Sequence, residues 1–271
     1  MRSLSNRVVL LTGAAGGIGA AMARQLSAQG ARLALVDRDG EGMRALASEL
    51  PASTTCHEID LSRPELLEPL VAEVIDAHGE LSVLIANAGV TIHAPFGELK
   101  TSEIDLVLDV DLRGVLHLVA HALPHLREAD EAHIVLVSSM AGLQAFPLQS
   151  IYGAAKHGLR AYGEALRMEL GAENIGVTTL LPGTIATGFM ANAGDHDLEE
   201  TTQMVRLMKR WGTSPERVAR AGVRGILKNR GRIRVGWDCH LVSALQWIAP
   251  PLLPLLLTLG ARRRLRGQVT D

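Results

Sequence analysis

The sequence predicts an α/β fold in which a doubly wound parallel sheet carries helices on both faces. Two observations lead to this prediction. Short runs of Val, Ile and Leu alternate with longer segments of helical pattern, as in chains built from strand–helix–strand units. The first of these runs ends in a glycine-rich turn that leads directly into a helical segment. Such a turn is typical of the first strand of a Rossmann-like sheet.

Composition narrows the class of protein. The chain has 271 residues, of which 47% are hydrophobic and 21% charged, with a net charge of −2. These values fit a compact globular protein and argue against a disordered chain or one that binds nucleic acid through bulk charge. No linker-like stretch divides the chain, so we expect one catalytic domain over residues 1–271. The two cysteines match no disulfide or metal spacing, and residues 1–7 do not resemble a signal peptide, so we expect no metal and a cytoplasmic protein.

The expected elements follow in chain order. Each predicted strand is apolar on both sides of its period, as expected for strands buried between two helical layers. Longer helical segments connect them, and right-handed crossovers would place a ligand at the carboxyl ends of the strands. The predicted strands are residues 8–11, 33–36, 83–86, 134–137 and 177–181, and the clearest helices are residues 20–29, 64–78 and 151–170.

The turn after the first strand predicts a dinucleotide site. Residues 12–19 read Thr-Gly-Ala-Ala-Gly-Gly-Ile-Gly, and here Gly13, Gly17, Ile18 and Gly19 would let a pyrophosphate approach the helix N-terminus. Asp37 closes the next strand about 20 residues further on, where a carboxylate accepts hydrogen bonds from ribose hydroxyls. Because that carboxylate repels a 2′-phosphate, NAD is favoured over NADP. The neighbouring Arg38 could pair with such a phosphate and keeps NADP open.

A second pattern predicts acid–base chemistry. Tyr152 and Lys156 are four residues apart at the start of a helical segment and therefore share one face. An ammonium beside a phenol stabilises the phenolate and brings its pKa toward the working range. Ser139 follows the strand 134–137 and is placed to hold a substrate oxygen, whereas Ser138 is the more structural neighbour.

Together these motifs resemble the short-chain dehydrogenase/reductase family over residues 5–240. The resemblance implies an NAD(P)-dependent oxidoreductase in which Tyr152 is the acid/base, Ser139 orients the substrate and Lys156 also holds the nicotinamide ribose. It further implies a homodimer or homotetramer associating through the helices around residues 104–125 and 151–170. The remaining cofactor contacts that it implies are Asp60 with Leu61 at the adenine, Asn87, Ala88 and Gly89 along the cleft, and Pro182, Gly183, Ile185 and Thr187 around the nicotinamide.

One position departs from the family pattern. The family usually has Asn in a Val-Asn-Leu-x-Gly segment that leads to the active-site lysine, and here residues 110–114 carry Asp111 instead. A carboxylate accepts hydrogen bonds but cannot donate as an amide does. Near Lys156 the carboxylate would stabilise the charged ammonium form of the lysine and leave the pKa of the tyrosine less depressed. We therefore include Asp111 among the catalytic residues.

The chain ends in an apolar and then basic tail, residues 241–271. No residue between 241 and 260 is formally charged, and four arginines follow at 262, 263, 264 and 266. Three prolines argue against a spanning helix, so we expect the tail to cover the substrate cleft or a subunit contact. Such a tail indicates an apolar alcohol or carbonyl substrate. The alternatives are a catalytically impaired, cofactor-binding regulatory protein, and a reductase of a lipid-like substrate attached to a membrane surface through residues 241–266.

Overall fold

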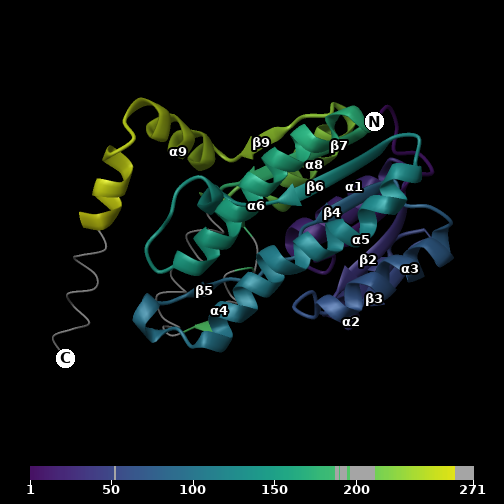
Figure 1. Cartoon of the computed structure of the whole chain (residues 1–271), viewed down its shortest axis with the longest axis horizontal. Helices are drawn as coiled ribbons and strands as arrows, with labels where there is room; N and C mark the ends of the chain where they lie inside the picture. Colours follow the sequence, from purple (N-terminus) through teal and green to yellow (C-terminus); the bar gives the residue numbers. More distant parts are fainter. Residues whose placement is uncertain (52, 187–188, 190–193, 196–210, 260–271) are drawn as a thin grey trace.

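A computed structural model describes residues 1–51, 53–186, 189, 194–195 and 211–259, and its centre is a seven-stranded parallel sheet (Figure 1). The strand order is β3-β2-β1-β4-β6-β7-β9, and every neighbouring pair is parallel. This confirms the predicted fold class. The strands are β1 (Val8–Thr12), β2 (Arg32–Asp37), β3 (Thr55–Glu58), β4 (Val83–Ala86), β6 (Ala132–Val137), β7 (Ile175–Pro182) and β9 (Arg232–Val235).

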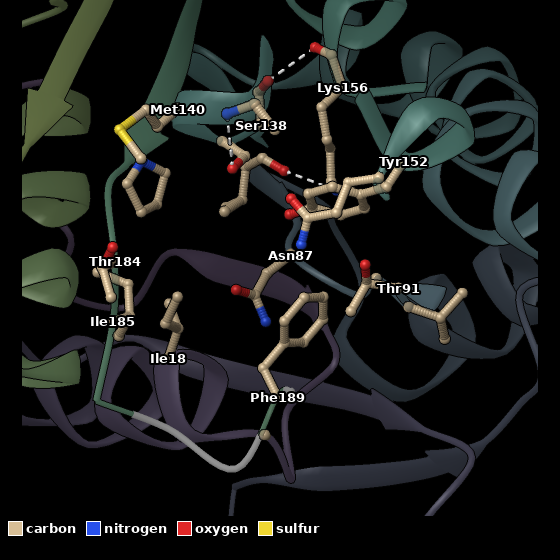
Figure 2. Close-up of a pocket in the computed structure, with 18 of the residues that line it drawn as sticks. Ile18, Asn87, Thr91, Ser138, Met140, Tyr152, Lys156, Thr184, Ile185 and Phe189 are labelled. Carbon is tan, nitrogen blue, oxygen red and sulfur yellow. Dashed lines mark hydrogen bonds between the residues drawn. The ribbon is translucent and has the colours of Figure 1, made fainter. Parts of the chain in front are cut away.

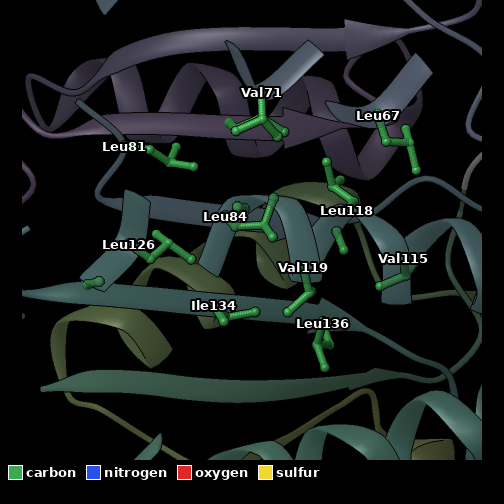
Figure 3. Close-up of a cluster of buried hydrophobic side chains, with 14 of the residues drawn as sticks. Leu67, Val71, Leu81, Leu84, Val115, Leu118, Val119, Leu126, Ile134 and Leu136 are labelled. Carbon is green, nitrogen blue, oxygen red and sulfur yellow. The ribbon is translucent and has the colours of Figure 1, made fainter. Parts of the chain in front are cut away.

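Helices cover both faces of the sheet. One face packs against α3 (Leu67–His78), α5 (Gly114–Glu128) and α6 (Ser150–Glu169), through a core in which Leu84 of β4 and Ile134 of β6 are fully buried (Figure 3). The other face packs against α1 (Gly17–Ala28), α2 (Gly40–Ser48) and α8 (Pro215–Leu227). Strands buried on both faces account for the unbroken apolar runs in the sequence.

The strand order positions the functional site. The chain moves outward from β1 through β2 to β3 and then returns to place β4 on the other side of β1. The strand order therefore reverses between β1 and β4. Ligands of such sheets bind at this reversal, beyond the carboxyl ends of the strands.

Two outer strands were not among the predicted ones. β3 reads Thr-Cys-His-Glu and β9 reads Arg-Ile-Arg-Val, and both have exposed positions between less exposed ones. Each lies at an edge of the sheet, where polar and charged side chains can face water. The search for continuous apolar runs therefore missed both strands.

Several smaller elements lie outside the seven-stranded sheet. α4 (Thr101–Leu108) runs into a π-helical turn, Asp109–Arg113, before α5 begins. Strands β5 (Ile92–His93) and β8 (Gly194–Asp195) form a separate parallel pair. Beyond β9, α9 (Trp237–Ile248) and a helix at Leu252–Leu259 extend past the end of the sheet (Figure 1).

None of the described helices alone has the length and hydropathy of a membrane span. α9 and Leu252–Leu259 reach them only when joined, and the two helices are bent by 116°.

Candidate active site

The glycine turn lies between β1 and α1 and is tightly packed. Gly13 has φ +65°, and a Cβ added there would lie 2.8 Å from the Ala88 Cα. A Cβ on Gly19 would lie 2.0 Å from the Gly13 carbonyl oxygen. Helix α1 begins at Gly17 without a side-chain cap on its first N–H groups. An uncapped helix N-terminus preceded by a turn with glycine at 13, 16 and 17 fits a pyrophosphate.

Asp37 fixes the adenosine end of the site. One carboxylate oxygen accepts a hydrogen bond from the Ala15 N–H at 2.9 Å, and the other accepts from the Asp39 N–H at 3.0 Å. The carboxylate is thus tied to the glycine turn while each oxygen keeps a lone pair for a ribose hydroxyl. Arg38 is exposed beside it, and Asp60 and Leu61 line the same end of the cavity. The residues present fit an adenosine group.

Asn87 joins the end of β4 to the glycine turn. Its side-chain amide donates to the carbonyl oxygens of Thr12 at 3.0 Å and Gly13 at 3.1 Å. The backbone N–H groups of Asn87 and Ala88 donate to the Thr12 hydroxyl at 3.0 and 3.1 Å. These bonds hold the turn and the end of β4 in one rigid unit, which explains how residues 75 positions apart shape one cleft.

Tyr152 and Lys156 occupy the first turns of α6 and point into the cavity (Figure 2). The Lys156 ammonium nitrogen lies 5.6 Å from the centre of the Tyr152 ring. Ser139 hydrogen-bonds the Tyr152 phenol, and its hydroxyl oxygen also accepts from the Ala141 N–H at 3.0 Å. Ser138 instead donates to the Lys156 carbonyl oxygen at 2.8 Å and is buried. The two serines thus have the different placements expected of them.

Asp111 lies behind these residues, on the π-helical turn between α4 and α5. One carboxylate oxygen lies 3.0 Å from the Lys156 nitrogen, and the other accepts from the Val90 N–H at 2.6 Å. Both side chains of this ion pair are almost completely buried. Gly89 makes the approach possible, since a Cβ there would lie 3.2 Å from Asp111 and 3.3 Å from Lys156. π-Helical turns are frequent at functional sites.

Burial and neighbouring charges set the protonation of this cluster. Burial raises the pKa of the Tyr152 phenol; the Lys156 ammonium opposes this rise and the Asp111 carboxylate adds to it. Burial is the largest influence on the pKa of Lys156 and lowers it, but the charges of Asp111 and Tyr152 and the hydrogen bond to Asp111 together outweigh burial, so the pKa is raised and the ammonium form is kept. Burial raises the pKa of Asp111 against the pull of Lys156 and the Val90 N–H. The expected effect of Asp111, a less depressed tyrosine pKa, agrees with this arrangement.

The loop after β7 closes the nicotinamide end and is held by a residue of α9 that the sequence did not reveal. Pro182, Gly183 and Ile185 line the cavity. The Thr184 N–H donates to the Asp238 carboxylate at 2.6 Å, and a Cβ on Gly183 would lie 2.1 Å from the same carboxylate. Asp238 stands at the start of α9, after the unpredicted strand β9, so no local pattern connected it with this loop. Thr187 lies outside the described residues.

A single cavity of about 1470 Å³ contains nearly all of the expected site. Every predicted site residue in the described part of the chain lines it, except Asp111, which supports Lys156 from behind. Figure 2 shows Ile18, Thr184 and Ile185 on one side of the view and Tyr152 and Thr91 on the other. The cavity also has apolar walls from Phe146, Pro147, Leu148 and Trp237, which the sequence did not single out, and from Trp211. Further apolar walls come from Leu241, Val242, Leu256 and Leu257, which belong to the tail that was expected to cover the substrate cleft.

Comparisons with known proteins show the family to which the chain is similar. A family model described as short chain dehydrogenase matches residues 7–198. The oxidoreductase SadH of Mycobacterium tuberculosis is 32% identical over 270 residues, covering 97% of this chain and 98% of SadH. A short chain dehydrogenase/reductase from Burkholderia phymatum in complex with NAD has a similar structure, with a TM-score of 0.86 at 24% identity, covering 93% of this chain and 97% of that one. Levodione reductase gives a TM-score of 0.78 at 26% identity, covering 89% and 99%.

Proposed function

The chain belongs to the short-chain dehydrogenase family of oxidoreductases, and we propose that it interconverts an alcohol and a ketone or aldehyde on an apolar small molecule. The observation that carries the proposal is the convergence of Ser139, Tyr152 and Lys156 on the cavity whose other end is built from the glycine turn and Asp37. A nicotinamide cofactor held there would accept or supply the hydride.

The protein's own residues would handle the oxygen and its proton. Ser139 would orient the substrate oxygen next to the Tyr152 phenol, to which it is already hydrogen-bonded. In reduction the phenol donates its proton to the developing alkoxide, and in oxidation the phenolate removes the proton of the alcohol. Lys156 would stabilise that phenolate, and Asp111 would hold the lysine in place through the 3.0 Å ion pair.

We propose NAD rather than NADP as the cofactor. The Asp37 carboxylate is fixed by two backbone N–H groups at the end of β2, where its charge would repel a 2′-phosphate. Arg38 is exposed and is the residue through which NADP would bind. The Burkholderia phymatum relative in complex with NAD supports the choice.

The walls of the cavity favour an apolar substrate. Next to Tyr152 the Phe189 ring lies 6.0 Å away, centre to centre. Further out, Trp237, Leu241 and Val242 of α9 and Leu256 of the following helix form an apolar side. Apolar walls with a few convergent polar groups at one end are typical of sites for small apolar ligands. By family resemblance we also propose a homodimer or homotetramer, which light scattering would identify.

The central assignment is tested by comparing two tyrosine variants. The probe is a series of secondary alcohols with apolar chains of increasing length, assayed with NAD. Tyr152→Phe should lower kcat by about 10²- to 10⁴-fold, the usual contribution of a general acid–base group, and should still bind NADH. Tyr162→Phe is the matched control, because Tyr162 is the other tyrosine of the chain and packs against the core on the same helix. Equal loss in both variants, or undiminished turnover in Tyr152→Phe, would remove the assignment.

A further inference from the structure

Two helices at the C-terminal end of the described chain carry large apolar side chains into solvent. On α9, Trp247 is 87% exposed and Ile248 is 74% exposed. On the following helix Leu252, Leu255 and Leu259 are each 41% to 56% exposed. We call these five side chains the C-terminal apolar face. Single exposed apolar residues are ordinary, but a group of this size on adjoining helices indicates a surface that meets something apolar.

The same two helices also form a wall of the active-site cavity. Leu241 and Val242 of α9, and Leu256 and Leu257 of the next helix, line the cavity. The Gln246 amide ties α9 to the Leu143 carbonyl oxygen, beyond the end of β6. The apolar face and part of the cavity wall therefore belong to the same two helices.

The sequence beyond the face indicates what covers it. No charged residue occurs between 241 and 260, and then Arg262, Arg263, Arg264 and Arg266 follow. Apolar residues beside a basic cluster are typical of segments that lie in the interface of an anionic bilayer. The 116° bend between the helices suits a segment that lies on a surface.

We propose that the C-terminal apolar face docks on the surface of a membrane that contains anionic lipids, and that apolar substrates reach the cavity from that membrane. Trp247 and Ile248 would enter the boundary between headgroups and acyl chains, where tryptophan is favoured. The arginines that follow in the sequence would add attraction to lipid phosphates, each by about fivefold in affinity. The statement about substrate entry rests on the proposed function, whereas the docking itself does not.

The test is flotation of the full-length protein with vesicles. One set is phosphatidylcholine alone, and the other contains phosphatidylglycerol as well. We expect the protein to float with the anionic vesicles and to be released by high salt. A Trp247→Glu/Ile248→Glu double variant should lose at least about tenfold in vesicle affinity, since it replaces two inserted apolar groups by charges. Neither residue lines the cavity, so NADH titration of the variant should match wild type.

Phe96→Glu serves as the matched control. Phe96 is 63% exposed, lies outside the cavity and is distant in sequence from the face, so this variant should float as wild type does. If the double variant no longer binds NADH, the test is instead the quenching of tryptophan fluorescence in the wild-type protein by brominated lipids. Brominated lipids should quench the wild-type fluorescence, and Trp247→Phe should remove most of that quenching. The proposal is overturned if anionic vesicles do not float the protein or float the double variant equally. It is also overturned if the double variant only dissociates an oligomer in light scattering. Flotation without NADH binding would instead count against the proposed function alone.

Discussion

Replacing Asp111 by Asn tests how the buried ion pair controls the direction of proton transfer. The carboxylate lies 3.0 Å from the Lys156 nitrogen, which lies 5.6 Å from the centre of the Tyr152 ring. These two distances place the negative charge within about 9 Å of the phenol ring, where at an effective dielectric constant of ~20 it raises the energy of a phenolate by about 2 kcal/mol. That energy corresponds to a roughly 10- to 30-fold change in the ratio of phenolate to phenol at a given pH.

The sign follows from the charges around Tyr152. Lys156 lowers the pKa of the phenol and Asp111 raises it, so a neutral residue at 111 leaves the lysine uncompensated and lowers the tyrosine pKa. In Asp111→Asn we therefore expect the pH profile of kcat/KM for alcohol oxidation to move toward acid by the equivalent of about 2 kcal/mol. Oxidation near neutral pH should gain relative to reduction. The Asn side-chain oxygen can still accept from the Val90 N–H, so the π-helical turn should stay folded.

The assay is the full pH profile in both directions with one alcohol–ketone pair. Asp109→Asn is the control, because Asp109 lies on the same turn but pairs with Arg113 near the surface at 3.3 Å, and its profile should match wild type. A purely structural role for Asp111 would lower the rate at every pH without moving the profile. An unchanged midpoint in a variant that binds NADH, or a shift toward alkaline pH, would refute the electrostatic argument.

Three further outcomes are expected. Gly19→Ala should destabilise the fold by about 1–3 kcal/mol and weaken NADH binding in thermal and fluorescence titrations, because its Cβ would lie 2.0 Å from a backbone oxygen. Gly97→Ala, where a Cβ would have nothing within 4 Å, should change neither stability nor NADH binding. Asp37→Asn should reduce the preference for NADH over NADPH in paired titrations, and an unchanged ratio would contradict the role of the charge. Burial lowers the pKa of His133 to about 3, below an unfolded value of about 6.5. The stability that the neutral form of His133 contributes is complete above the unfolded value and falls with acidification by up to about 1.4 kcal/mol per pH unit. The free energy of unfolding of His133→Gln, measured with denaturant, should therefore depend less on pH between 6.5 and 3 than that of wild type.

The parts of the fold that the sequence predicted correctly are those governed by local periodicity. Central strands such as β4 and β6 are buried on both faces and read as continuous apolar runs. The edge strands β3 and β9 were missed because half-exposed strands carry polar and charged residues. In the same way, the four-residue spacing of Tyr152 and Lys156 is enough to place both on one face of α6.

Pairings between distant segments depended on the tertiary structure. The sequence marked Asp111 as unusual, but only the packing of the π-helical turn against α6 brought its carboxylate to 3.0 Å from Lys156. Asp238 carried no signal, and it reaches the loop after β7 because β9 pairs with β7 and delivers α9 to that end of the sheet. Local sequence determined which residues could form strands, turns and a reactive pair, since those choices depend on neighbours within a few positions. Contacts across 45 or 54 residues depended on how the layers pack, and that packing decided which charge faces Lys156 and which helices enclose the substrate space.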